Sequence, residues 1–73
     1  MNYEEFKKAA LSMFEGGFLK EEDPSVRRPF MESDEAEAVI RRHFENGGTR
    51  EDAETADDEL TDLFAAWMAA SAK

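Results

Sequence analysis

The chain has 73 residues, of which 18 are acidic and 9 basic, and its formal net charge is −9 at pH 7. It contains no cysteine, which excludes a disulfide framework, a cysteine zinc site and a thiol nucleophile. No apolar run approaches the ~20 residues that span a bilayer, and the acidic N-terminus lacks the apolar region of a secretory signal, so we expect a single cytoplasmic domain over residues 1–73.

The first predicted helix covers residues 3–16. Asn2 is a favourable N-cap and Glu5 follows three residues later, as in a capping box. Apolar side chains recur at the 3.6-residue spacing of one helical face, at Tyr3, Phe6, Ala10, Met13 and Phe14. The pair Gly16 and Gly17 then ends or kinks the helix.

Residues 20–32 are predicted to form a connector. Pro29 disfavours the α conformation at Arg28, which argues against a helix there. The connector is nevertheless too apolar for a free linker. We expect three of its side chains to fix it to the core, namely Val26, Phe30 and Met31.

The second predicted helix covers residues 34–46, and helix signals mark both of its ends. Ser33 is a favoured N-cap, and acidic residues follow it where the helix dipole favours negative charge. Its inward stripe consists of Ala36, Val39, Ile40 and Phe44. Its last turn carries the cations Arg41, Arg42 and His43, before the stop signal Asn46, Gly47 and Gly48.

His43 is the only histidine of the chain. It is a candidate pH switch or general base, but no side chain in its sequence context is recognisable as a catalytic partner. Its place in the last turn of a helix predicts instead that it offsets the helix dipole. We therefore predict that the protein is not an enzyme.

The third predicted helix covers residues 50–71. Thr49 and Asp52 form a pair like a capping box at its start. The apolar stripe continues to the end of the helix through Ala53, Ala56, Leu60, Leu63, Phe64, Trp67 and Met68. Residues 57–59 are acidic and are an alternative start for a second, shorter helix, so the sequence leaves open whether this helix is continuous.

The predicted fold class is all-α, because no segment alternates polar and apolar residues long enough for a strand. We expect a compact three-helix bundle, with a four-helix bundle as the alternative. Aromatic residues make up 11% of the chain, more than a disordered acidic tail would contain.

Acidic residues follow one side of the third predicted helix. The candidate partner-binding residues are Glu51, Glu54, Asp57, Asp58, Glu59 and Asp62. Carboxylates three or four residues apart stand ~5–6 Å apart on a helix, and a DNA strand presents a phosphate every ~3.4 Å. The stripe is therefore interpreted either as a mimic of nucleic acid that occupies a basic protein surface, or as a solvated face that serves solubility. The carboxylates lack the spacing of an EF-hand loop, and we predict no metal or cofactor.

Three large apolar residues near the end of the same helix have two interpretations. Phe64, Trp67 and Met68 are predicted either to belong to the core or to form an apolar interface with a second copy or a partner.

In size, charge and helix content the whole chain resembles the small acidic helical inhibitors encoded by phages, including anti-CRISPR proteins, although it carries no motif of one family. Many such proteins also contain strands, which this sequence does not predict. The resemblance implies an inhibitor in the host cytoplasm that blocks a nucleic-acid-binding machine, such as a CRISPR effector complex. Its partner would be a basic protein surface, with no direct contact to nucleic acid or membrane. The alternative is a helical protein–protein interaction or dimerisation module.

Overall fold

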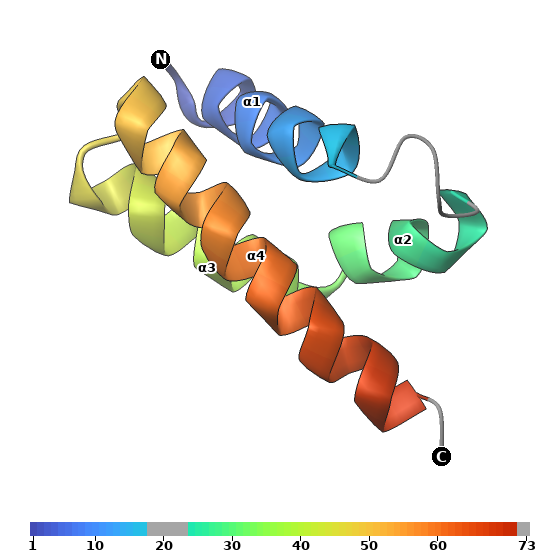
Figure 1. Ribbon diagram of the computed structural model, residues 1–73. Coiled ribbons are helices and arrows are strands. Elements are labelled where there is room, and N and C mark those ends of the chain that lie inside the picture. The colour runs from blue at the N-terminus through green and yellow to red at the C-terminus, as the bar shows by residue number, and fades with distance from the viewer. Residues whose placement is uncertain (18–23, 72–73) are drawn as a thin grey trace.

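Four helices contain most of the residues that the computed structural model describes, which are residues 1–17 and 24–71 (Figure 1). They are α1 (Tyr3–Gly16), α2 (Pro24–Met31), α3 (Asp34–Asn46) and α4 (Arg50–Ser71). No strand occurs in these two stretches. The predicted all-α class is therefore confirmed, in its four-helix form.

Side-chain caps begin α1 and α3 where the sequence predicts them. The Asn2 side chain accepts a hydrogen bond from the backbone N–H of Glu5 at 2.8 Å, and the Glu5 carboxylate accepts one from the backbone N–H of Asn2 at 3.1 Å. The hydroxyl of Ser33 accepts a bond from the backbone N–H of Ala36 at 3.2 Å. Each cap satisfies a donor that has no acceptor inside the helix, so the start of the helix is fixed locally.

The prediction of a connector over residues 20–32 is wrong for the part that forms α2, while residues 20–23 lie outside the described residues. Pro24 occupies the first helical position, where the missing N–H costs nothing. Pro29 lies inside the helix and has no N–H, so one backbone hydrogen bond of α2 is lost. Arg28, the residue before it, is nevertheless helical. Burial of Phe30 offsets this loss, because its ring enters the core and packs with its centroid 5.6 Å from that of Phe14.

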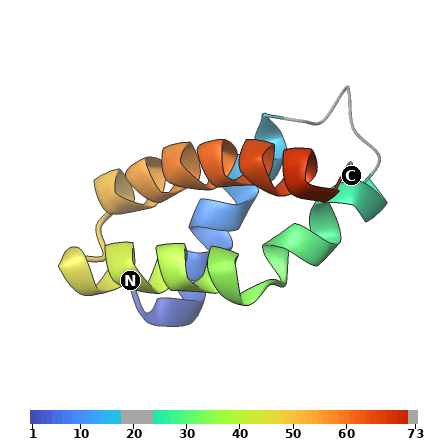
Figure 2. The ribbon, with the colours of Figure 1, turned by 90° about the horizontal axis from the view of Figure 1, so that it is seen from below.

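Helices α3 and α4 run side by side in opposite directions, and α1 lies across this pair (Figure 2). All four helices contribute to one core. Its buried residues are Phe6, Ala10, Phe14, Phe30, Ala36, Val39, Ile40, Ala53, Ala56, Leu60 and Phe64. The three apolar stripes predicted from the sequence therefore meet in the interior, joined by the phenylalanine of α2.

The long helix α4 continues through residues 57–59 without a break, so the alternative of two shorter helices is wrong. Leu60, directly after this acidic stretch, is fully buried, and α4 packs against both α1 and α3. No helix in the described part of the chain combines the length and apolar composition required to cross a bilayer.

The acidic outer face of the fourth helix

Four carboxylates of α4 form an exposed face that points away from the core. Successive helical residues are rotated by about 100°, so a helix that buries Ala53, Ala56 and Leu60 turns its other side to solvent. Glu51, Glu54, Asp58 and Asp62 lie on that side and are all exposed. We call these four residues the outer acidic face. It extends for about 16 Å along the helix axis at ~1.5 Å per residue.

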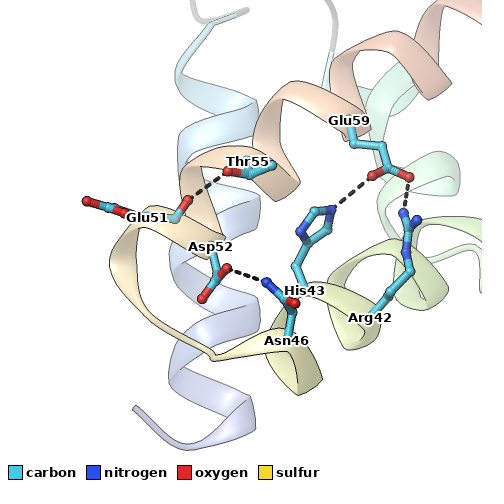
Figure 3. A network of polar contacts seen from close by, with 7 residues as sticks. All are labelled: Arg42, His43, Asn46, Glu51, Asp52, Thr55 and Glu59. Atoms are coloured by element: carbon cyan, nitrogen blue, oxygen red, sulfur yellow. Dashed lines mark hydrogen bonds and ion pairs between the residues drawn. The ribbon is translucent and has the colours of Figure 1, made fainter.

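The outer acidic face concentrates four negative charges on one side of α4. Within residues 1–17 and 24–71, no lysine or arginine lies within ion-pair distance of any of its four carboxylates. In Figure 3 the Glu51 side chain points away from the polar contacts between α3 and α4. Repulsion among the four carboxylates opposes the folded state and would be relieved by a cationic partner.

Glu59 does not belong to this face, although the sequence placed it among the partner-binding candidates. One of its carboxylate oxygens is 2.9 Å from Nε2 of His43, and the other is paired with Arg42 (Figure 3). The hydrogen bond with His43, followed by that from Arg42, lowers the pKa of Glu59 below its usual value. Glu59 therefore joins α4 to α3, and we remove it from the partner-binding set.

His43 lies in the last turn of α3, as the sequence predicts, and the same contact gives its ring a partner on α4. The sequence identified no partner for this side chain, since Glu59 lies sixteen residues further along the chain. The antiparallel arrangement of α3 and α4 brings the two together (Figure 3). The sequence did contain a signal for this contact. Glu59 follows Asp52 by seven residues, so the two lie on the same side of α4, the side that faces α3.

Asp57 lies at the border between the outer acidic face and the bundle. Its side chain is half-buried, and this burial raises the pKa of the Asp57 carboxyl above its usual value, with a further contribution from the charge of Asp58. The charged form of Asp57 is thus disfavoured by the fold. We assign it to the edge of the face rather than to its centre.

The start of α4 is fixed by the capping pair that the sequence predicts. Asp52 accepts hydrogen bonds from the backbone N–H of Thr49 at 3.0 Å and from its hydroxyl at 2.8 Å. It also accepts one from the Asn46 side chain at 3.1 Å (Figure 3). These bonds, the backbone one first, lower the pKa of Asp52. They join the end of α3 to the start of α4 and so help to orient the outer acidic face.

The three residues of the predicted apolar interface differ in how far they are buried. Phe64 is only 4% exposed and packs against the ring of Phe30 at 5.2 Å, so it belongs to the core and is removed from the interface. Trp67 is half-buried with its ring 5.6 Å from Phe30. Met68 is 38% exposed and is the member of the three most accessible to a partner.

A groove that the sequence did not reveal lies between α1 and α2, with a volume of about 500 Å³. It is lined by Lys7, Leu11, Glu15, Arg28, Met31 and Glu32. Its lining mixes cations, carboxylates and apolar side chains. In the described stretches, no group of three or more histidine, aspartate or glutamate residues is placed to hold a metal ion.

Comparisons with protein-family models, with curated proteins and with solved structures found no match.

Proposed function

We propose that this protein is a small acidic inhibitor that binds the basic surface of a nucleic-acid-binding machine through the outer acidic face of α4. A phage-encoded inhibitor of a CRISPR effector complex is the example that its size and charge resemble. Binding alone would block the machine, because the carboxylates would occupy the cations that otherwise hold phosphates. No reaction is required.

One observation supports this proposal above the others. Glu51, Glu54, Asp58 and Asp62 lie exposed on one rigid helix and have no cation within ion-pair distance in the described part of the chain. Glu59, by contrast, is paired with Arg42 and His43 of α3 and so joins two helices of the fold. A rigid helix also presents its charges without the entropy cost of ordering a loop.

The test is a competition experiment with a purified CRISPR effector complex and fluorescent target DNA. The protein is added in increasing amounts, and displacement of the DNA is followed by fluorescence anisotropy. We expect displacement that weakens steeply as salt rises, because the attraction is between exposed charges. A variant with Glu51→Gln, Glu54→Gln, Asp58→Asn and Asp62→Asn should lose at least about tenfold in apparent affinity.

A matched control removes the same amount of charge from other exposed positions. Glu4, Glu32, Glu35 and Glu45 are all exposed and lie outside α4, and their replacement by glutamine also changes the net charge from −9 to −5. This control should inhibit nearly as well as the parent. If both variants lose the same affinity, overall charge and not the outer acidic face drives binding. If both variants displace the DNA as well as the parent does, the proposal is contradicted.

A further inference from the structure

The outer side of α4 changes its chemistry after Asp62. From residue 63 to residue 70 every side chain is apolar, whereas charged residues make up 37% of the whole chain. Five of these apolar residues are exposed, namely Ala65, Ala66, Met68, Ala69 and Ala70. In Figure 1 this red end of α4 extends further than the other three helices.

The exposed apolar residues cover more than half of the helix circumference and are not confined to one stripe. At about 100° per residue, the positions from Met68 through Ala65, Ala69 and Ala66 to Ala70 cover roughly 200° of the circumference. The remaining arc is turned to the bundle through Leu63, Phe64 and Trp67, which pack against the core. A helix that is apolar all round is normally buried. This end of α4 therefore has the surface of a helix that is enclosed by something else.

The extent of this surface favours a pocket in a partner over a second copy of the chain. A parallel or antiparallel helix from another copy would cover one side of α4 and leave much of the arc in water. Two turns of helix also supply far less than the ~800 Å² per partner of a stable interface. Two copies would in addition bring together net charges of −9 each.

The acidic and apolar parts are continuous along one line of the helix. Ala65 and Ala69 follow Asp58 and Asp62 at spacings of three, seven or eleven residues, so all four lie on the same side of α4. A partner that meets the outer acidic face therefore also meets the apolar end. Charge complementarity requires cations opposite the first part and none opposite the second.

We propose that the partner's surface combines a row of cations with an adjoining apolar pocket, and that the exposed side of residues 65–70 of α4 enters this pocket. This inference rests on the proposed function, and it specifies the chemistry of the partner. The outer acidic face directs the approach, and the apolar end slows dissociation because its burial is insensitive to salt.

The experiment uses two synthetic helical peptides as probes and Trp67, the only tryptophan, as the reporter. One peptide carries lysines on one side and leucines on the other. The second has the same lysines and has glutamine in place of each leucine. We expect both to bind at low salt, but only the leucine peptide to remain bound at about 1 M salt and to shift the Trp67 emission to shorter wavelength.

A pair of neutral substitutions tests the apolar end without changing charge. Ala66→Gln with Ala69→Gln should weaken binding of the leucine peptide by about tenfold, because the added amides must lose water to enter an apolar site. Ala38→Gln is the matched control, since Ala38 is exposed on α3. It should bind as the parent does.

Three results would overturn the inference. If the two peptides bind with equal affinity and leave Trp67 emission unchanged, the apolar end is not a binding element, although the outer acidic face still is. If the Ala66 and Ala69 variant matches the parent, the same conclusion follows. If neither peptide binds even at low salt, the outer acidic face attracts no cation, and the proposed function fails as well.

Discussion

Neighbouring carboxylates of α4 have different roles because of where the helix turns them. Glu59 contacts His43 and Arg42 of α3, whereas Asp58, one residue earlier, is exposed on the outer acidic face. Asp57, one residue earlier again, is half-buried at the border. Each step along the helix rotates the side chain by about 100°, so three consecutive acids meet three different environments.

Replacing Glu59 with glutamine should destabilise the protein at neutral pH. The neutral amide loses the charge that pairs with Arg42 and His43. The contact is partly exposed, so we expect the free energy of unfolding to fall by about 0.5–1 kcal/mol. Urea denaturation at pH 7, followed by circular dichroism, measures this difference.

The effect of Glu59→Gln should disappear in acid. The pKa of Glu59 is lowered in the folded protein, so its contribution is complete above its unfolded pKa of about 4.3. The contribution is lost as the pH falls through the lowered folded pKa, where the carboxyl becomes protonated in both states. A difference between parent and variant that stayed constant from pH 7 down to acid would contradict the assigned contact.

Asp57→Asn should have the opposite effect and stabilise the protein at pH 7. The pKa of Asp57 is raised by burial and by Asp58, so its charged form is less favourable in the folded state than in the unfolded state. The gain should appear only above the unfolded pKa of about 3.9. We expect Tm to rise by about 2–4 °C, measured by thermal circular dichroism.

Asp62→Asn is the control for this prediction, because Asp62 is exposed on the outer acidic face. It removes the same charge without relieving burial, and its effect on Tm should be smaller. An equal rise in both variants would assign the gain to net charge alone.

At the scale of elements, the turn between α3 and α4 decides where the outer acidic face points. Gly48 has a φ of +63°, in the left-handed region that favours glycine. Its N–H bonds the carbonyl of His43, and the Asp52 cap follows directly. A Cβ at Gly48 would lie 3.0 Å from Cδ1 of Phe44, whose ring is packed 5.4 Å from that of Tyr3.

Gly48→Ala should therefore cost about 1–2 kcal/mol of stability from the left-handed conformation alone, and the contact with Phe44 adds to it. Gly16→Ala is the control, since a Cβ there meets nothing within 4 Å at the end of α1. Alanine favours the helix over glycine, so this variant should be at least as stable as the parent. Urea denaturation compares them, and equal stability of the two variants would refute the role assigned to Gly48.

At the scale of the whole molecule, the charge of −9 acts against the fold. Salt screens this repulsion, so Tm should rise between about 0.01 M and 1 M salt, as the Debye length falls from ~30 Å to ~3 Å. The variant lacking all four charges of the outer acidic face should remain folded and should show a smaller rise. Thermal denaturation at several salt concentrations measures both. A less stable variant would mean that these carboxylates serve the fold and not a partner.

The sequence by itself determined the helical class, three of the helices and their caps. Those features depend on local chemistry, since the side chains of Asn2, Ser33 and Thr49 each accept a hydrogen bond from a backbone N–H only three residues away. The inward stripes were equally predictable, because the period of a helix is fixed. The four exposed carboxylates of the outer acidic face follow from that same period.

Only the tertiary structure decided the remaining features. Helix α2 forms because the core accepts Phe30, which outweighs the local effect of Pro29. Glu59 pairs with Arg42 and His43 and is not part of the outer acidic face, because the fold places these residues of α3 beside it. Phe64 is buried for the same kind of reason, since the space that it fills is created by other helices. Local propensities act within a few residues, whereas burial and charge pairing are settled by whichever segments the fold brings together.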